Sequence, residues 1–89
     1  MKTTFLRSFV KDLKAHEREK KLLDRVQEVI LEVEAAETIL AIKNLKKLKA
    51  KGSYYRIRLG NYRIGLIIES ETVTFVRFLH RRDIYRYFP

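Results

Sequence analysis

The sequence contains no cysteine among its 89 residues and only one proline. Without cysteine the chain can form neither a disulfide nor a thiolate metal site, which fits a reducing compartment. No basic start is followed by a long apolar run, so we expect neither a signal peptide nor a membrane span and place the protein in the cytoplasm. A chain of this length supports one small core, so residues 1–89 are predicted to form a single domain.

Acidic residues are scarce in the second half of the chain. Residues 1–42 hold eight Lys/Arg and eight Asp/Glu, whereas residues 43–89 hold twelve Lys/Arg and only three Asp/Glu. The whole net charge of +9 therefore lies in residues 43–89. A one-sided basic field attracts nucleic acid, an anionic membrane or an acidic protein segment, and the charge alone does not choose among them.

Clusters of metal-ligating side chains are also lacking. Glu32, Glu34 and Glu37 are close in sequence, but residues 32 and 34 do not share a helical face and no histidine is near them. His16 lies in a polar stretch between two apolar patterns, and we interpret it as a solvated surface residue. We therefore expect no metal site and no cofactor.

The strongest strand signal begins with a hairpin. Polar and apolar residues alternate through Arg56–Leu59 and again through Tyr62–Leu66, and Gly60 and Asn61 separate the two runs. This pattern predicts two antiparallel strands joined by a two-residue turn.

The predicted hairpin gathers three arginines on one face of a sheet. Its turn sets Arg58 directly opposite Arg63, with Arg56 on the same face, because side chains alternate along a strand. Like charges in such a pair destabilise a sheet by roughly 0.2–1 kcal/mol. An anion between the arginines would offset this repulsion, and Gly65 leaves the neighbouring position without a side chain. Solvated arginines on an exposed face are the open alternative.

The rest of the chain completes an α+β pattern. The run Thr3–Leu6 predicts an edge strand. Ser8 is predicted to cap a helix that begins at Phe9. Residues 22–33 predict a second, longer helix with one apolar face. No glycine or proline marks the break between the helical patterns, so one bent helix remains an alternative. The predicted order is β-α-α-β-β-β, with two N-terminal helices packed on an antiparallel sheet of about four strands and a short C-terminal helical turn.

Two segments are less determined. Residues 35–51 predict a weak helical turn or an irregular crossover. Such a basic segment can lie on a membrane, but we favour a continuous basic surface with the hairpin.

The last predicted strand, Thr72–Leu79, has a conflict of register. A strict two-residue turn at residues 70–71 would place Arg77 on the core face opposite Ile64. A different loop length, a β-bulge or a place for Arg77 at the sheet edge would each remove this conflict.

The pattern YRIRLGNYRIG, followed near the end by FLHRRDIY, resembles the RelE/ParE superfamily of bacterial and archaeal toxins from type II toxin-antitoxin systems. The resemblance covers essentially the whole chain. RelE-like members cleave mRNA in the ribosomal decoding site and so inhibit translation, whereas ParE-like members inhibit DNA gyrase through protein contacts. The C-terminal arginine and tyrosine make the RelE-like branch, a metal-independent endoribonuclease or mRNA interferase, the better match.

The resemblance implies a catalytic surface made from Arg58, Arg63, Arg81 and Tyr85. RNA scission by its own 2′-hydroxyl requires stabilisation of charge on the phosphorane oxygens, and the forks of Arg58 and Arg63 suit such oxygens. Arg81 is expected to donate a hydrogen bond or a proton to the leaving oxygen. Tyr85 is expected to stack on a base or orient the nucleotide. Further RNA contacts are expected from Arg56, Lys47, Lys49, Lys51, Arg82 and Arg86.

The general base is the weakest part of this comparison. RelE-type sites have lysine at a strand position where this chain has arginine, and an arginine with a pKa above about 12 is a poor proton acceptor. We hypothesise that His80, next to Arg81, transfers the proton, because its unperturbed pKa is close to neutral. The alternative is that His80 packs at the strand end and orients the arginines.

The resemblance also implies partners. A cognate antitoxin is expected to lay an acidic or amphipathic segment over the basic face, and operator DNA is expected to be bound only through that antitoxin. The other partners are the ribosome and mRNA, with no membrane. Two other functions stay open, namely a ParE-like gyrase inhibitor on the same fold and an RNA-binding module that retains nucleic acid by counterion release.

Overall fold

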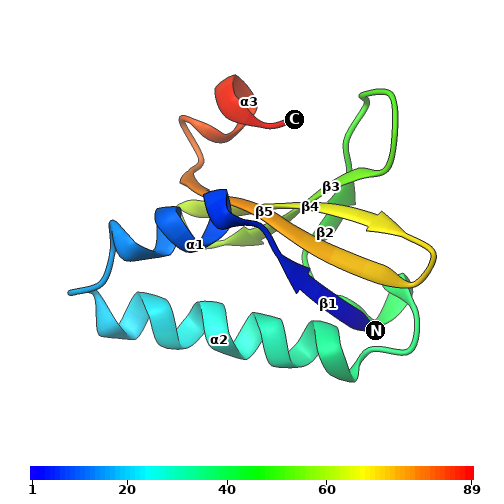
Figure 1. Ribbon diagram of the computed structural model, residues 1–89, viewed down its shortest axis with the longest axis horizontal. Coiled ribbons are helices and arrows are strands. Elements are labelled where there is room, and N and C mark those ends of the chain that lie inside the picture. The colour runs from blue at the N-terminus through cyan, green and yellow to red at the C-terminus, as the bar shows by residue number, and fades with distance from the viewer.

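The computed structural model describes all 89 residues, and its first strand is separated from the other four by helices. The elements are β1 (Lys2–Phe5), α1 (Arg7–Lys14), α2 (Lys20–Ala35), the 3-10 turn η1 (Ile39–Ala41), β2 (Leu45–Lys47), β3 (Tyr54–Leu59), β4 (Tyr62–Glu69), β5 (Thr72–His80) and α3 (Ile84–Tyr87). In Figure 1, α2 runs beneath the sheet and α3 lies above its opposite side. The predicted α+β class is confirmed.

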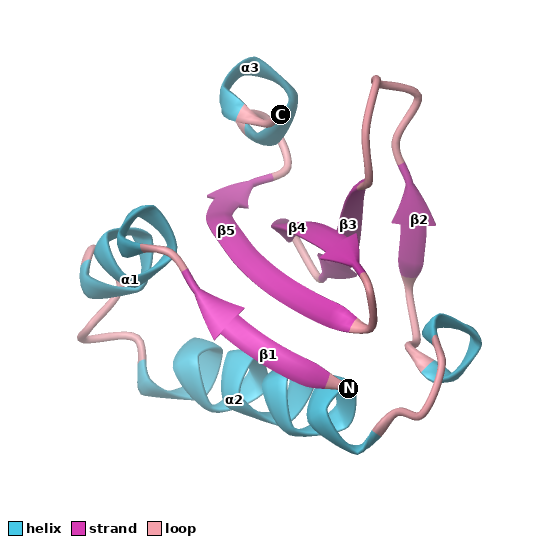
Figure 2. Cartoon of the chain, turned by 45° about the vertical axis from the view of Figure 1, so that its right-hand side comes forward, coloured by secondary structure: helices cyan, strands magenta, loops and turns pink.

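The strands form one five-stranded sheet in the order β1-β5-β4-β3-β2. β1 runs parallel to β5, and the other three pairs are antiparallel, so the sheet is mixed. Figure 2 shows β1 and β2 at its two edges. The strand beyond the predicted four is β2, which has three residues within a lysine-rich stretch. A strand this short gives no alternation long enough to detect.

The hairpin forms with the predicted register. Leu59 pairs with Tyr62 and Arg58 with Arg63. The φ angle of Gly60 is +59°, a conformation that glycine adopts without strain. The turn between β3 and β4 therefore has the two residues that the sequence indicated.

A β-bulge settles the register of β5. The turn at residues 70–71 does have two residues, both with positive φ, as in a type I′ turn. Val76 has no partner across β4, and after this extra residue Arg77 pairs with Gly65. The bulge keeps Phe78 buried on the core face and returns Arg77 to the opposite face.

The N-terminal helical region contains two separate helices. α1 begins at Arg7, two residues before the predicted start, and no side chain caps it. The predicted cap, Ser8, lies inside the helix, and its Oγ donates to the carbonyl oxygen of Val76 at 2.6 Å. No helix of the protein combines the length and the apolar character needed to span a bilayer.

His16, in the connection between α1 and α2, packs against the sheet and is not the solvated residue that we expected. Its ring meets those of Tyr62 and Phe78 edge-on, with centroids 5.2 and 5.4 Å apart, and its Nδ1 pairs with Glu19. Only 21% of its side chain is exposed. The sequence around His16 is polar, and the rings that cover it come from distant strands.

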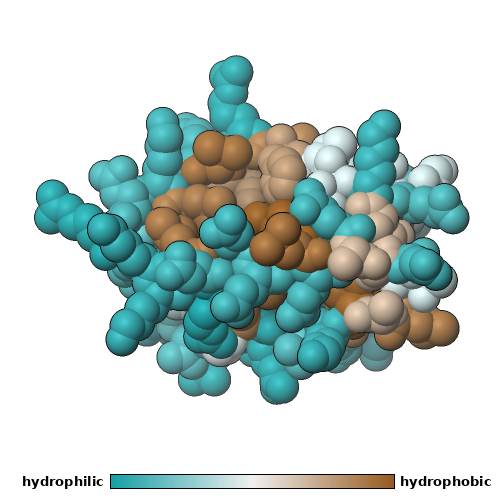
Figure 3. All heavy atoms as spheres, turned by 90° about the horizontal axis from the view of Figure 1, so that it is seen from below, coloured by the Kyte–Doolittle hydropathy of each residue, from teal (hydrophilic) through white to brown (hydrophobic).

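The core lies between the sheet and the two N-terminal helices. Phe9 of α1 contacts Phe75 of β5 with ring centroids 5.3 Å apart. Burying one such side chain stabilises the fold by about 1.5–3 kcal/mol. The cluster also contains Val26, Val33, Ile57, Ile64 and Leu66. From the α2 side the surface is largely hydrophilic with some apolar patches (Figure 3). This packing uses one face of the central strands, and α3 lies over part of the other face.

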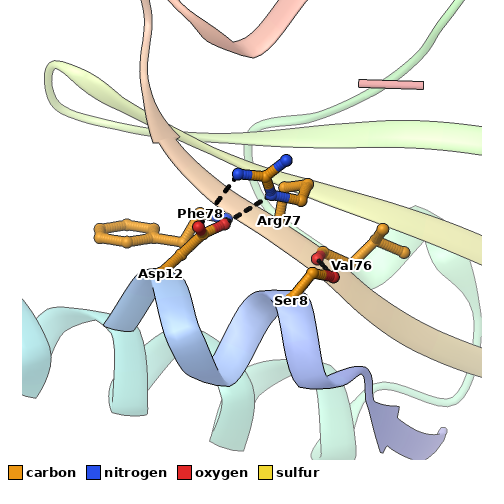
Figure 4. Close-up of polar contacts among 5 residues, drawn as sticks. All are labelled: Ser8, Asp12, Val76, Arg77 and Phe78. Atoms are coloured by element: carbon orange, nitrogen blue, oxygen red, sulfur yellow. Dashed lines mark hydrogen bonds and ion pairs between the residues drawn. The ribbon is translucent and has the colours of Figure 1, made fainter. Parts of the chain in front are cut away.

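α1 covers the edge of β5 where β1 ends. β1 pairs with β5 only as far as Phe75. Farther along, the hydroxyl of Ser8 donates to Val76, and the Asp12 carboxylate accepts the backbone N–H of Phe78 at 2.9 Å (Figure 4). Side chains of α1 thus satisfy backbone groups that a neighbouring strand would otherwise pair.

Candidate functional site

A group of arginines and one tyrosine gathers on the sheet face opposite α1 and α2. Arg56 and Arg58 come from β3, Arg63 from β4, and Arg81 and Tyr85 from the segment after β5. We call these five residues the arginine surface. Arg58 and Arg63 are directly opposite each other across the hairpin, an arrangement in which the Cβ atoms lie about 4.5–5.5 Å apart.

Arg63 is the electrostatic centre of the arginine surface. Its pKa is lowered by burial first and then by the positive charges of Arg56, Arg58 and Arg81, whereas Tyr85 acts in the opposite direction. All four groups therefore lie within electrostatic reach of one guanidinium. The arrangement favours an anion at this point, because an anion would relieve the repulsion.

The guanidinium of Arg63 is held in place by main-chain oxygens. Its Nη1 donates to the carbonyl oxygens of Gly60 and Tyr62, both at 2.9 Å. These bonds fix the group at the β3–β4 turn without neutralising it. The side chain of Arg58 is exposed and makes no hydrogen bond or ion pair with the rest of the chain.

Arg56 keeps an unused hydrogen-bond donor. One of its terminal nitrogens, Nη1, donates to the carbonyl oxygen of Asn44 at 2.9 Å. Its Nε is buried and has no partner. Leaving such a donor unpaired costs about 1–3 kcal/mol.

The C-terminal segment is tied to the hairpin by its backbone. The N–H of Arg81 donates to the carbonyl oxygen of Asn61 at 2.8 Å, which places Arg81 beside the turn that holds Arg63. Tyr85 follows on α3 and is 62% exposed. The hairpin and the C-terminal segment thus contribute to the same surface.

Arg77 lies on the same face but is already paired. Its guanidinium donates to both carboxylate oxygens of Asp12, at 2.8 and 3.1 Å (Figure 4). The hydrogen bond to Asp12 raises the pKa of Arg77, more than burial lowers it. Arg77 therefore joins α1 to β5 and is not available to an anion.

His80 and Arg82 do not face the arginine surface. His80 pairs with Tyr62, which packs on the core side, and the two rings meet with centroids 5.5 Å apart. Both residues line a hollow near Asp12 on the helix side. The Nδ1 of His80 accepts the backbone N–H of Arg82 at 3.2 Å. This placement does not support proton transfer by His80. It agrees with the part of the alternative in which His80 packs at the strand end, but not with a direct role in orienting Arg58 or Arg63.

The two lysines of β2 lie on opposite faces of the sheet. Lys47 pairs with Tyr55 and lines an apolar hollow on the helix side, so it is directed away from the arginine surface. Lys46, which pairs with Arg56, is the lysine on the arginine side, and the sequence analysis missed it. Recognising the short β2 and its register would have identified it. The remaining predicted basic residues, Lys49 and Lys51 in the β2–β3 loop and Arg86 on α3, are exposed.

Gly65, which leaves the position next to the arginines without a side chain of its own, is covered by the ring of Phe88. A Cβ atom at position 65 would lie only 2.8 Å from that ring. The arginine surface itself is open, and no cavity is lined by Arg56, Arg58 or Arg63. No group of three or more His, Cys, Asp or Glu side chains is placed to bind a metal ion. An open basic face suits an extended anionic polymer.

Residues 4–85 match the profile of a protein family described as ParE toxin of type II toxin-antitoxin system, parDE. The chain belongs to the RelE/ParE toxin family. Over 93 residues, covering both chains completely, this toxin is 43% identical to Toxin RelE3 of Methanocaldococcus jannaschii. It is therefore a RelE-like toxin of a type II toxin-antitoxin system.

Solved structures share the fold of this toxin. A chain of the RelB-RelE antitoxin-toxin complex from Methanococcus jannaschii matches it with a TM-score of 0.75 and 41% identity, over 97% of this toxin and 99% of that chain. A chain of the YoeB-YefM complex from Staphylococcus aureus gives a TM-score of 0.71 over 90% of this toxin and 95% of that chain. Its identity of 18% supports the fold alone.

Proposed function

We propose that this toxin is an endoribonuclease that cleaves mRNA in the ribosomal decoding site. The observation that carries the proposal is the meeting of three arginines at one turn: Arg58 is opposite Arg63 across the hairpin, and the backbone of Arg81 is bonded to Asn61 in the same turn. Arg56 and Tyr85 lie within electrostatic reach of Arg63. Only two ion pairs are present in the molecule, and neither includes a member of the arginine surface. Its positive charge is therefore available to an external anion.

The reaction joins the 2′-oxygen of one nucleotide to the adjacent phosphorus and breaks the bond from that phosphorus to the 5′-oxygen of the next. Arg58 and Arg63 are positioned on neighbouring strands to bind the non-bridging oxygens, where negative charge grows in the transition state. Tyr85, exposed on α3, supplies an aromatic face for a base. The products are a 2′,3′-cyclic phosphate and a free 5′-hydroxyl.

Proton movements are the second requirement. Arginine remains protonated, so the 2′-hydroxyl proton passes to water while the guanidinium groups stabilise the resulting oxyanion. Arg81 donates a hydrogen bond to the departing 5′-oxygen, which takes its proton from water. The groups on the arginine surface are guanidinium and phenol groups, so charge stabilisation in this proposal comes from the protein and not from a metal ion.

Regulation follows from the same charge. We propose that a cognate antitoxin covers the arginine surface with an acidic segment, because twelve basic residues in the second half of the toxin form only one internal ion pair. The solved relative from Methanococcus jannaschii is a complex with its antitoxin RelB. In this proposal the toxin works in the cytoplasm, and operator DNA is contacted only through the antitoxin.

A second candidate is inhibition of DNA gyrase, because the matching family profile carries the ParE description. The fold alone does not separate the two activities. A supercoiling assay with purified toxin distinguishes them, since gyrase inhibition with intact translation would select the second candidate.

Toeprinting on translating ribosomes tests the nuclease directly. The parent toxin should cut the message, and Arg63→Ala should cut it about 10²–10³-fold more slowly, the usual cost of removing one stabiliser of the transition state. Arg18→Ala, which removes an exposed arginine in the α1–α2 connection, is the matched control and should cut like the parent. Equal cutting by Arg63→Ala, or no cutting by the parent, would contradict the proposal.

A further inference from the structure

The helix α3, which carries Tyr85, is too short to hold itself in place. It has four residues, and its N-cap residue, Asp83, makes no side-chain capping bond. Isolated helices shorter than about 12–15 residues are marginal in water. The position of Tyr85 on this face of the sheet must therefore come from the way α3 is attached to the strands.

The two ends of the α3 segment are buried, whereas its middle is exposed. Ile84 is 0% exposed and Phe88 is 2% exposed, but the tyrosines between them, Tyr85 and Tyr87, are 62% and 54% exposed. Neither Ile84 nor Phe88 belongs to the core cluster between the sheet and the N-terminal helices. Phe88 is thus an anchor on the opposite side of the sheet.

Gly65 forms the place where this anchor sits. A Cβ at position 65 would approach three atoms of the Phe88 ring at 2.8–2.9 Å, distances that real Cβ atoms essentially never show. The ring also meets the edge of Tyr54, with centroids 5.6 Å apart and planes at 87°. Gly65 does not have a positive φ, so the position requires glycine for space rather than for backbone conformation.

The strand register places the contact between Gly65 and Phe88 in the middle of the sheet face that carries Arg56 and Arg63. Gly65 lies opposite Arg56 on one side and opposite Arg77 on the other. The guanidinium carbon of Arg77, which is paired with Asp12, lies 5.8 Å from the ring centre of Tyr87. This cation–π contact is a second attachment of α3 to the sheet. Arg63 is two residues before Gly65 on the same strand and therefore points to the same face.

We propose that Phe88 and Gly65 are a pair of positioning residues: the ring of Phe88 fits over Gly65 and thereby sets the place of Tyr85 beside Arg63. This inference rests on the proposed function for its consequence in catalysis, but the contact itself is testable without any activity. It assigns to the last turn of the chain a role separate from contact with RNA.

Amide hydrogen exchange tests the contact in the intact toxin. The amides of Arg86, Tyr87 and Phe88 donate to carbonyl oxygens of Asp83 and Ile84, so they report whether α3 is closed. Gly65→Ala should speed their exchange by about tenfold or more, because the added methyl group displaces the ring. Phe88→Ala should have a similar effect, while amides of the core strands stay protected in both variants.

The matched control is Gly65→Ala in a variant that lacks the Phe88 ring. In a Phe88→Ala background, Gly65→Ala should change neither exchange nor cleavage further, because the three atoms nearest the added methyl group all belong to the Phe88 ring. In the parent background, Gly65→Ala should lower kcat for mRNA cleavage by about 10²-fold with little change in KM, since misplacing a positioned group by about 1 Å has effects of this size.

Each result has a definite meaning. Unchanged exchange in Gly65→Ala, or an equal effect of Gly65→Ala with and without the Phe88 ring, would overturn the pairing. If exchange responds as expected but the parent toxin does not cleave mRNA, the nuclease proposal fails while the role of the pair in placing α3 stands. If exchange responds and the parent cleaves but kcat of Gly65→Ala is unchanged, the pair does not position Tyr85 for catalysis.

Discussion

Arg77 and Arg63 lie on the same face of the same sheet, yet their surroundings differ. Arg77 forms two hydrogen bonds with the Asp12 carboxylate, and this pairing raises its pKa. Arg63 has only carbonyl oxygens as partners, and burial together with the nearby arginines lowers its pKa. The comparison teaches that an arginine with an internal carboxylate holds the fold together, whereas one surrounded by like charges is left for a ligand.

The largest expected effect comes from giving Arg63 the kind of partner that Arg77 has. Arg58→Glu places a carboxylate directly opposite Arg63, where the two can form an ion pair. Cleavage of mRNA should fall by about 10³-fold or more, because one cation is lost and another is neutralised. Stability should rise by about 0.2–1 kcal/mol as a repulsive cross-strand pair becomes attractive. Single-turnover cleavage and urea unfolding measure the two effects.

Arg58→Gln is the control for that variant, and its cleavage rate should lie between those of the parent and Arg58→Glu. A glutamate variant that still cleaves like the parent would show that the pair of arginines does not bind the reacting phosphate.

The converse experiment removes the partner of Arg77. Asp12→Ala leaves a partly buried guanidinium and the N–H of Phe78 without an acceptor. The free energy of unfolding should fall by about 2–3 kcal/mol, measured by urea titration, because unpaired buried polar groups carry their full desolvation cost. Asp24→Ala, which removes an exposed carboxylate on α2, should change it by less than about 0.5 kcal/mol. Equal losses in the two variants would remove the structural role assigned to the ion pair.

A smaller effect is expected from anions. Sulfate in place of chloride should stabilise the parent by about 0.5–1 kcal/mol through binding at the arginine surface. Sulfate also stabilises proteins in general by exclusion from their surfaces. Arg58→Glu is therefore measured beside the parent, because only the general stabilisation by sulfate should remain in that variant. Identical gains in thermal unfolding temperature for both proteins would indicate that the arginine surface binds no anion.

The smallest effect is expected at His80, which packs beside Tyr62 on the other face. Glutamine can also accept the backbone N–H of Arg82, so His80→Gln should cleave mRNA within about threefold of the parent rate. The pH dependence of cleavage should likewise be unchanged between pH 5 and 8. A loss of about 10²-fold or more, the usual contribution of a general acid or base, would restore His80 as the proton-transfer group.

The sequence was sufficient for the parts of the fold that depend on neighbours along the chain. The alternation around Gly60 and Asn61 predicted the hairpin, and with it the pairing of Arg58 with Arg63. The split of charge between the two halves predicted a basic surface. The grouping of Arg81 and Tyr85 with the hairpin arginines was implied by the resemblance to the RelE/ParE superfamily and not by the residues alone.

Features that depend on contacts between residues far apart in the sequence could not be predicted from it. Whether His80 faces Arg63 depends on the β-bulge at Val76, which the sequence left as one of three alternatives. Lys46 was missed because β2 is too short to show a period. The ring of Phe88 fills the space at Gly65, and nothing in the sequence indicates that the C-terminal segment returns there.

The most direct test of the central claim is a side-chain NMR titration of the arginine Nε–H groups with a short single-stranded RNA whose scissile 2′-oxygen is methylated. We predict that the signals of Arg56, Arg58 and Arg63 shift on binding and that added salt reverses the shifts, whereas Arg77, already bound to Asp12, does not respond. Equal shifts of Arg77 and Arg63, or no shift of Arg63 at saturation, would contradict the account.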